Sequence, residues 1–499
     1  LKHTIMVNVA SYVGLGALIA LHLFPLIAEC KSPNIVFILT DDEDQLLSGS
    51  RIVEHNIMPN RQRIFVENGI SFNYAFASTP TCCVSRSSIL TGKFVQNHQV
   101  FNNSVAGNCW SSRFRATQEP YSYAAYLHEY GEYNTFYAGK YLNEYGEADT
   151  IGDSAFDIPF GYDHWYALAG DIRFYNYCQS NMGEQQCYGF DPQDYHTTVI
   201  RNHAMDFLQS RKTQDDGRPF LLVFSTIGCH SPFTVEDKYQ GLDFGQKSPR
   251  TPNWNMVVGA DGDHHSLLKQ QSKMDEVIIA ESDQIYAMRL GTLRSVDDAI
   301  GDIYNYIDEQ LDEKDNTYFI YASDHGFHNG QWAMAFSKML LYETDVRIPF
   351  YMHGPDLKRG AESNVFATTV DIAPTILDIA GIDLQQIDDG NQMDGKSLLP
   401  YSVMDGEDEA EVEEEEMEEQ VFLIEYHGQG FDADSYLPIL SNIPGFHQVV
   451  SDAWNNTYAC LRWMNEKSGA DFKYCKFKCF ASGMVEADCD RSTTEARGE

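Results

Sequence analysis

Basic residues are scarce in this sequence. Its 499 residues include 35 Lys and Arg against 73 Asp and Glu, which gives a formal net charge of −38. A field of that sign repels polyanions, so the composition argues against binding to nucleic acid or to an anionic membrane surface. Part of the excess is local, because residues 405–419 hold eleven carboxylates and no base. We expect residues 405–420 to form a solvated, disordered insert.

Cysteines are also few. Eleven in a chain of this length are too few for a disulfide scaffold, although they suit a secreted enzyme. Cys82 and Cys83 are adjacent, and neighbouring cysteines rarely pair with each other, so we expect one of the two to lie outside a bridge. Two local bridges are expected elsewhere, Cys178–Cys187 and Cys460–Cys475.

One apolar stretch approaches the length of a membrane span. It covers residues 7–28 and follows Lys2 and His3. A short apolar segment with basic residues before it is typical of a signal peptide, which we predict over residues 1–30. A membrane anchor is the alternative, since the stretch is near the lower limit for a span. No cluster of Lys and Arg flanks the stretch to stop transfer, so we favour cleavage and expect no stable membrane insertion.

Two glycosylation sequons support a secretory route. They begin at Asn102 and Asn455 and read Asn-Asn-Ser and Asn-Asn-Thr. Such sequons also arise by chance, but here they agree with the predicted signal peptide. We therefore predict a lysosomal or extracellular protein.

Four apolar runs end abruptly in polar side chains. They cover residues 34–39, 134–138, 219–224 and 317–322, with helical patterns such as 283–307 between them. Continuous apolar runs bounded by turn signals are typical of parallel strands buried on both faces. Their alternation with helices predicts an α/β domain with a large, mostly parallel sheet flanked by helices. Ligands of such sheets bind at the carboxyl ends of the strands, so the polar groups there should converge. These groups are Asp41-Asp42, Lys140, His230 and Asp324-His325.

The C-terminal region differs in character from the rest. Residues 421–426 are strand-like, and residues 421–499 contain four of the cysteines. We predict a catalytic domain over residues 31–404 and a smaller α+β subdomain over residues 421–499. No internal repeat is visible.

The pair Asp41-Asp42 indicates a metal site. Two carboxylates about 4 Å apart repel by roughly 4 kcal/mol at an effective dielectric constant of about 20, so they need a proton, a base or a cation between them. Asp324-His325 occupies the same topological position on another strand. Several oxygen ligands and one imidazole favour a hard divalent ion such as Ca²⁺ or Mg²⁺. A lone Asp-Asp is more often a turn or a helix cap, but the second pair favours the metal.

The segment that begins at Cys82 is the most specific motif. Cys82-Cys83-Val84-Ser85-Arg86, followed by Leu90-Thr91-Gly92, resembles the sulfatase signature Cys-x-Pro-Ser-Arg-x-x-x-Leu-Thr-Gly. The resemblance implies that Cys82 is oxidised to formylglycine by the formylglycine-generating enzyme in the secretory pathway. The position of Arg86, four residues after Cys82, selects Cys82 over Cys83. Val84 departs from the family's usual Pro or Ala, which bears on the efficiency of that oxidation.

The resemblance extends over about residues 34–475, and it is close to the N-acetylglucosamine-6-sulfatases. Further similar blocks are 136–146, 321–350, 371–381 and 452–460. The family implies an alkaline-phosphatase-like fold and one Ca²⁺ ion. It also implies a sulfated glycan substrate, with the 6-sulfate of N-acetylglucosamine in heparan- or keratan-type chains as the ester that is cleaved.

The resemblance also implies roles for single residues. The hydrated formylglycine attacks sulfur with one hydroxyl, and its second hydroxyl then expels sulfate. Arg86 holds this diol, and His230 contacts the sulfate and protonates the leaving oxygen. Lys140 and Lys338 bind the sulfate oxygens. The Ca²⁺ ligands are expected to be Asp41, Asp42, Asp324 and His325 with the modified Cys82.

Some assignments stay open on the sequence alone. His328 is a candidate substrate contact, although a structural role fits it equally well. His230 precedes Ser231-Pro232 and is also readable as a loop histidine with a structural hydrogen bond. The base that assists sulfate release is unassigned, with His98 and Glu144 as weak candidates.

Other functions remain alternatives. One is an arylsulfatase or a glycan endosulfatase, although the endosulfatases usually carry a long basic insert that is absent here. A metal-dependent phosphatase would use Ser or Thr as its nucleophile and extra histidines for two zinc ions. An inactive sulfatase-fold binding protein is the third, because of Val84.

Overall fold

The computed structural model describes the chain in segments. These are residues 32–49, 52, 56–147, 156–214, 216–241, 247–259, 264, 266–269, 271–387, 390–403, 419–428, 456–465, 470–481 and 485–496. The predicted signal peptide, the acidic run up to residue 418 and the sequon asparagine Asn455 lie outside the described residues. Residues Pro33–Glu499 form one unit.

Ten strands form the main sheet, in the order β10-β2-β9-β8-β1-β7-β3-β4-β5-β6. Its five central strands, β8-β1-β7-β3-β4, are all parallel, whereas β9, β5 and β6 run antiparallel to their neighbours. The predicted large, mostly parallel sheet is confirmed, and the four predicted runs are β1, β3, β7 and β8. The strands are β1 (Asn34–Thr40), β2 (Ile70–Phe76), β3 (Asn134–Gly139), β4 (His164–Ala169), β5 (Cys178–Asn181), β6 (Glu184–Cys187), β7 (Phe220–Ser225), β8 (Thr317–Ser323), β9 (Phe350–His353) and β10 (Ala361–Thr368).

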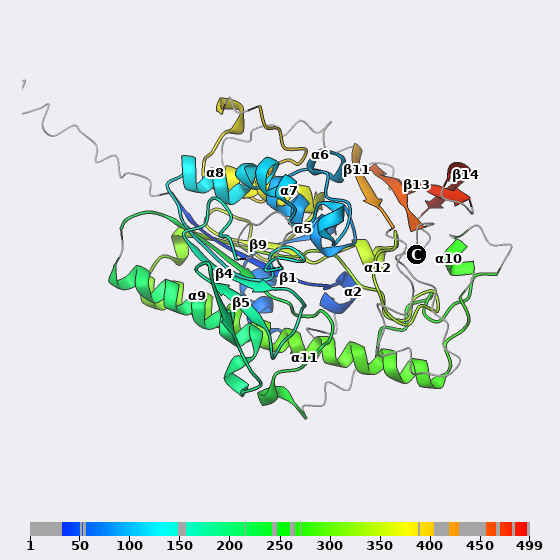
Figure 1. Ribbon diagram of the computed structural model, residues 1–499, viewed down its shortest axis with the longest axis horizontal. Coiled ribbons are helices and arrows are strands. Elements are labelled where there is room, and N and C mark those ends of the chain that lie inside the picture. The colour runs from blue at the N-terminus through cyan, green and yellow to red at the C-terminus, as the bar shows by residue number, and fades with distance from the viewer. Residues whose placement is uncertain are drawn as a thin grey trace, which may run out of the picture. The chain divides into compact units, whose positions relative to one another are not determined.

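Helices cover both faces of this sheet (Figure 1). Alternate residues of β1 face opposite ways: Ile35 and Phe37 join a core with α5, α8 and α13, and Val36 and Ile38 join a second core with α9 and α11. Burial on both faces explains why the central strands are continuously apolar. The longer helices are α5 (Cys82–Thr91), α7 (Ser112–Thr117), α8 (Tyr123–Tyr130), α9 (His196–Thr213), α11 (Glu276–Tyr306) and α13 (Ile372–Ile379). Short helices are α2 (Gln45–Ser48), α4 (Pro59–Arg61), α6 (Val95–His98), α10 (Ser266–Lys269) and α12 (Glu343–Val346).

Helix α11 begins before the predicted helical pattern. The apolar period indicates residues 283–307, whereas the helix covers Glu276–Tyr306. The reason is a cap: the side chain of Asp275 accepts hydrogen bonds from the backbone N–H groups of Val277 and Ile278, each at 3.0 Å. These contacts satisfy donors that the first turn of a helix leaves unpaired.

A second sheet lies in the C-terminal region. Its four antiparallel strands follow the order β11-β12-β13-β14. The predicted strand at residues 421–426 belongs to β11, whose Phe422 stacks on Phe76 of the main sheet with ring centroids 4.9 Å apart. This packing joins the two sheets through one apolar cluster. The strands are β11 (Glu419–Tyr426), β12 (Tyr458–Asn465), β13 (Ala470–Ala481) and β14 (Val485–Ala496).

Both predicted local disulfides are present, Cys178–Cys187 and Cys460–Cys475. Cys83 pairs with Cys109, so the doublet is divided between a bridge and a free thiol. Cys82 and Cys229 are the free cysteines of the described residues, and both are buried. In the same part of the chain, no helix has both the length and the apolarity to cross a membrane.

Candidate active site

The end of β1 places two carboxylates at the carboxyl edge of the sheet. Asp41 continues the strand direction, and Asp42 adopts a left-handed backbone with φ of 64°. The Asp42 N–H donates to Oδ1 of Asp324 at 3.2 Å, and the Asp42 carbonyl accepts from Nη2 of Arg289 at 2.5 Å. Arg289 is fully buried on α11 and also bonds Asp44 at 2.7 Å. The turn is thus held from both sides. Arg289 belongs to no recognisable sequence motif, so the sequence alone does not mark it as a residue of the site.

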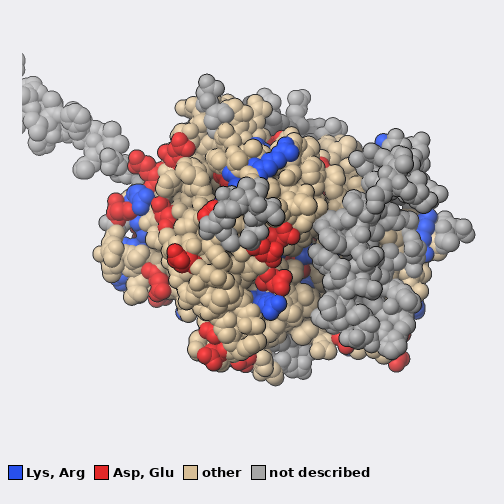
Figure 2. Space-filling model, viewed as in Figure 1, with Lys and Arg blue, Asp and Glu red and all other residues tan. Residues whose placement is uncertain are grey.

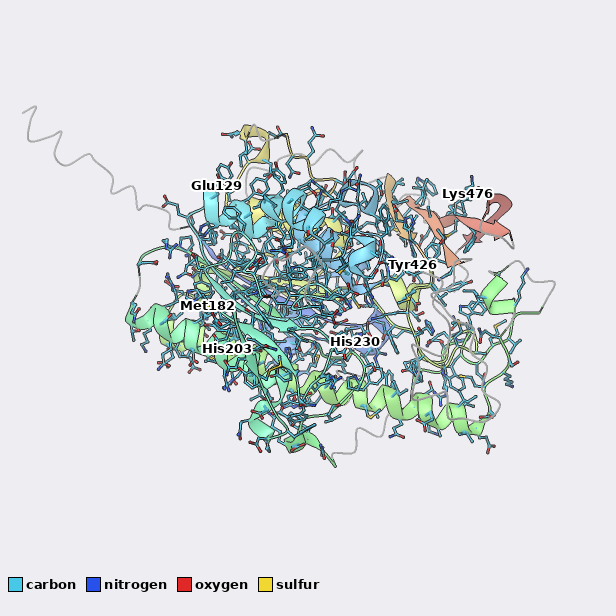
Figure 3. The ribbon with its side chains drawn as sticks, viewed as in Figure 1. Glu129, Met182, His203, His230, Tyr426 and Lys476 are labelled. Atoms are coloured by element: carbon cyan, nitrogen blue, oxygen red, sulfur yellow. A yellow bond between two sulfur atoms is a disulfide. The ribbon has the colours of Figure 1, made fainter. Side chains whose placement is uncertain are left out.

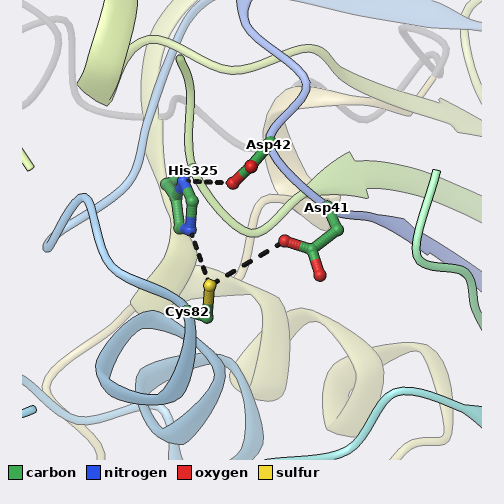
Figure 4. A group of neighbouring side chains, drawn as sticks. All are labelled: Asp41, Asp42, Cys82 and His325. Carbon is green, nitrogen blue, oxygen red and sulfur yellow. Dashed lines mark hydrogen bonds and ion pairs between the residues drawn. The ribbon is translucent and has the colours of Figure 1, made fainter. Parts of the chain in front are cut away.

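Helix α5 begins at Cys82 and directs its sulfur at the two carboxylates. Cys82 is 1% exposed. Its Sγ lies 3.0 Å from Nζ of Lys338, 3.4 Å from Nε2 of His325 and 3.9 Å from Oδ1 of Asp41. Figure 4 shows the sulfur facing both His325 and Asp41. Residues from the ends of β1 and β8 and from the segment that follows β8 therefore meet at this atom.

Cationic neighbours favour the ionised form of the Cys82 thiol. Burial raises its pKa, but the charges of Lys140 and Lys338 outweigh burial and hold the pKa well below the ordinary thiol value. Burial likewise opposes ionisation of Asp41, whose pKa nevertheless falls well below its usual value because of Lys140 foremost, with His230 and Arg86 adding to it. The charged forms of Cys82 and Asp41 are thus favoured although both side chains are buried.

Arg86 ties α5 to three strand ends. Its Nε donates to Oδ2 of Asp324 at 2.8 Å, and its Nη1 donates to the Lys140 carbonyl at 2.7 Å and to Oγ of Ser225 at 2.9 Å. Nη2 lies 3.4 Å from Oδ2 of Asp41. The guanidinium is 2% exposed. Its rigid fork suits such a multiple contact better than a lysine would.

Lys140 follows β3 directly. Its Nζ lies 2.5 Å from Oδ2 of Asp41. The preceding Gly139 has φ of 112°, and a Cβ there would stand 1.8 Å from the Ser225 carbonyl oxygen. Glycine is therefore required for β3 to approach β7 and to turn Lys140 into the site.

Lys338 and His230 complete the charged group. Nζ of Lys338 lies 2.7 Å from Oδ1 of Asp42. Although burial lowers the pKa of Lys338, Asp42 and Cys82 raise it well above its ordinary value, so the group stays cationic. Nε2 of His230 lies 3.8 Å from Oδ2 of Asp42, and its Nδ1 contacts the Ser231 carbonyl. Burial opposes protonation of His230, yet Asp42 raises its pKa.

Four of the predicted metal ligands form one compact group. Potential donor atoms of Asp41, Asp42, Cys82 and His325 all lie within 4.8 Å of one another. Asp324 is adjacent, with Oδ1 3.6 Å from Nε2 of His325. The carboxylate oxygens of Asp41, Asp42 and Asp324 suit a hard cation such as Ca²⁺, whereas the sulfur of an unmodified Cys82 does not. The group contains a single histidine, in contrast to the several expected of a two-zinc phosphatase.

Two further candidates have distinct surroundings. His328 is buried, and its Nδ1 contacts Asp345 at 2.9 Å. His98 contacts Oγ of Ser88 through Nε2 at 3.1 Å and accepts from the Val100 N–H through Nδ1 at 3.0 Å, and burial lowers its pKa to about 3. Both ring nitrogens of His98 are thus engaged. Their roles, like those of the other site residues, stay predictions.

A cavity of about 980 Å³ opens onto the group from solvent. Cys82, His230 and Lys338 line its buried end, and Glu144 lines its wall. Loops after α6, β3, β4, β6 and β7 supply the rest of its wall. Sequence reasoning missed these loop residues, which include Asn103, Glu147, Arg173, Phe190 and Asp237. His328 and His98 are not among the lining residues.

Comparison with known proteins agrees with the site. A model of the Sulfatase family matches residues 33–382. Human N-acetylglucosamine-6-sulfatase is 36% identical over 464 residues, which cover 92% of this chain and 79% of that protein. The extracellular sulfatase SULF-1 homolog of Drosophila melanogaster is 38% identical over 371 residues, covering 74% of this chain and 31% of that protein.

A solved structure shows the same fold. It is a protein in complex with its substrate D-glucosamine-2-N,6-O-disulfate, 21% identical, with a TM-score of 0.68 and coverage of 93% of this chain and 91% of that chain. The likeness confirms the expected alkaline-phosphatase-like architecture. With the family model over most of its length and the Cys82 motif at the centre of its polar cluster, the chain belongs to the sulfatase family of sulfuric ester hydrolases.

Proposed function

We propose that this protein hydrolyses the 6-sulfate ester of N-acetylglucosamine in heparan- or keratan-type glycans, acting at the chain end. One observation carries the proposal: the cavity ends at Cys82, where Lys338 stands 3.0 Å from the sulfur. The similarity to human N-acetylglucosamine-6-sulfatase over 92% of this chain supports the choice of ester.

Two groups complete the proposed site. Asp41, Asp42, Asp324 and His325 would hold Ca²⁺, which supplies positive charge next to the nucleophile and the sulfate. Formylglycine at position 82 would supply a geminal diol, and it would replace sulfur by oxygen at a place that a hard cation favours.

The protein's own side chains divide the remaining work. Lys140 and Lys338 donate to the sulfate oxygens and neutralise charge that grows as the ester bond breaks. His230 carries a proton for the departing sugar oxygen. Its position at the cavity wall, 18% exposed, allows contact with the substrate. Arg86 donates hydrogen bonds to Asp324, Lys140 and Ser225, and these contacts hold α5 against the strand ends.

The route to the site implies a compartment and a partner. Conversion of Cys82 requires the formylglycine-generating enzyme, which acts in the secretory pathway, and we propose a lysosomal or extracellular location. The predicted signal peptide, the sequons and the three disulfides of the described residues support that route.

Mass spectrometry of the peptide over residues 78–93 tests the proposal together with sulfate release. We expect the aldehyde at position 82 and release of sulfate from 6-sulfo-N-acetylglucosamine. An intact Cys82 thiol in protein from secretory expression would favour the inactive binding protein, with Val84 as its cause. If position 82 carries the aldehyde but no sulfate is released from 6-sulfo-N-acetylglucosamine, the protein is a sulfatase of another specificity.

An endosulfatase is the second candidate, because the Drosophila extracellular sulfatase homolog is 38% identical. Product analysis separates the two functions. An exo-acting enzyme desulfates only the terminal sugar of a 6-sulfated oligosaccharide, whereas an endosulfatase also desulfates internal sugars.

A further inference from the structure

The cavity above Cys82 changes its charge along its length. Its inner end holds buried Lys338 and half-buried His230. Its exposed end carries the carboxylates of Glu147 and Asp237. The two ends therefore favour different parts of a substrate: the buried end suits the anionic sulfate, and the exposed end does not suit a second anion.

The exposed carboxylates lack a cationic partner in the part of the chain that the structure describes. Asp237 begins a 3₁₀ turn (Asp237–Tyr239) after β7, and its Oδ1 accepts from Nε2 of Gln240 at 2.8 Å. The neighbouring Lys238 turns to Glu236 and Asp298 instead, at 3.1 and 3.0 Å. Glu147 likewise forms no ion pair among the described residues. Their negative charges are thus available to a ligand.

Arg173 is the cation on this wall, and it is already paired. Its Nη2 lies 3.1 Å from Oδ2 of Asp171, which also lines the cavity. The pair adds no net charge, so Glu147 and Asp237 decide the sign of the exposed end. Figure 2 shows one face of the molecule, on which more acidic than basic side chains are visible.

An exposed aromatic ring also lines the cavity. Phe190 follows β6 and lines the cavity, yet it is 75% exposed, the highest value among the large apolar side chains of the described residues that are exposed. A cavity lined by an exposed ring and by acceptor-only carboxylates offers an apolar face to the C–H groups of a sugar and acceptors to its hydroxyl groups.

We propose that the exposed end of the cavity binds the sugar next to the sulfated one and selects an uncharged sugar over a uronic acid. This inference rests on the proposed function and narrows it toward keratan-type chains, in which the neighbour is a neutral hexose. Hydroxyl groups donate to Glu147 and Asp237, whereas a uronate cannot donate through its carboxylate and is repelled by both.

Three substrates test the proposal: 6-sulfo-N-acetylglucosamine alone, its β-linked disaccharide with galactose, and its disaccharide with glucuronate. At low salt we expect kcat/KM to be about tenfold higher for the galactose than for the glucuronate disaccharide, a ratio that narrows as salt screens the carboxylates. The double variant Glu147→Gln/Asp237→Asn should lower the ratio to about twofold. Glu129→Gln is the matched control, since Glu129 lies on α8, well apart from His230 (Figure 3), and should keep the ratio of the parent protein.

Several results would overturn the inference. Equal or inverted preference in the parent protein would do so, as would a double variant with the parent's ratio. A selective loss of activity on the glucuronate disaccharide in Arg173→Gln would show that Arg173 binds the uronate carboxylate. These outcomes leave the proposed function intact if the monosaccharide is cleaved. No sulfate release from any of the three substrates would overturn the proposed function and this inference with it.

Discussion

The ammonium group of Lys338 lies 3.0 Å from the sulfur of Cys82, although 256 positions separate the two residues. Lys338 reaches this place from the segment that follows β8, and Asp42 anchors it at 2.7 Å. The contact brings a fixed positive charge to the atom at which the reaction is expected to begin.

Replacement of this lysine tests its role. We expect Lys338→Met to lower kcat about 10²- to 10³-fold, because a fixed, buried cation at the transferring group is lost. Sulfate release from 6-sulfo-N-acetylglucosamine gives kcat, and circular dichroism verifies folding. Lys212→Met, at an exposed position of α9, is the matched control and should retain activity. An unchanged kcat in Lys338→Met would show that Lys338 has no role in the reaction.

Metal removal is the second test. Dialysis against a Ca²⁺ chelator should abolish activity and lower the melting temperature, and added Ca²⁺ should restore both. Ca²⁺ at about 100 times its Kd would stabilise the fold by about 2.7 kcal/mol. Asp42→Asn should weaken the shift in melting temperature with Ca²⁺. Recovery with Zn²⁺ alone would instead support a phosphatase.

The third prediction concerns buried Glu119, whose ionisation should make the free energy of unfolding depend on pH. Burial raises its pKa to about 7, and the Tyr141 hydroxyl contacts it at 3.1 Å. Between about pH 4.5 and pH 7 the folded state keeps a proton that the unfolded state has lost, so stability falls as pH rises through this window. The loss amounts to about 3 kcal/mol.

Glu119→Gln should remove that dependence. Relative to the parent protein, the variant should gain stability from pH 4.5 to pH 7.5 in urea unfolding. Glu129→Gln, which alters an exposed carboxylate of α8, should follow the parent curve. A constant difference between Glu119→Gln and the parent across this range would contradict the assignment.

The fourth prediction concerns a buried ion pair in the C-terminal sheet, whose loss should lower the free energy of unfolding. Arg462 of β12 is 3% exposed and donates to both carboxylate oxygens of Asp471 on β13, at 3.1 and 2.8 Å. Arg462→Met removes both of these contacts, together with the contact of Arg462 with Glu343, and should lower the free energy of unfolding by about 3–5 kcal/mol. Arg462→Met/Asp471→Leu should recover most of the loss. A double variant no more stable than the single one would show that packing, not charge, holds the pair.

The central strands were predictable, and the edge strands were not. Strands buried on both faces, such as β1 and β7, must be apolar throughout, and this leaves a plain signal. Strand β6, Glu184–Cys187, is polar and exposed, so it forms because the hairpin with β5 and the Cys178–Cys187 bridge hold it. No property of those four residues alone indicates a strand.

The site shows the same division. Cys82 and Arg86 share one turn of a helix, and Asp41 and Lys140 end their strands, so local patterns mark them. Arg289 stands in the middle of a long helix and matters only because Asp42 comes to it from 247 positions away. Phe190 and Glu147 lie in loops, where side-chain type alone does not reveal which surface they face.

The burial of Cys82 bears on the order of folding and of the proposed modification of this residue. Every residue of Cys82–Thr91 is buried, and the neighbouring Cys83 is locked to Cys109. A modifying enzyme needs this segment extended and open, a state that the finished fold does not offer. The proposed conversion of Cys82 would therefore have to come before the fold closes over it, and a chain that folds first would keep an unconverted thiol.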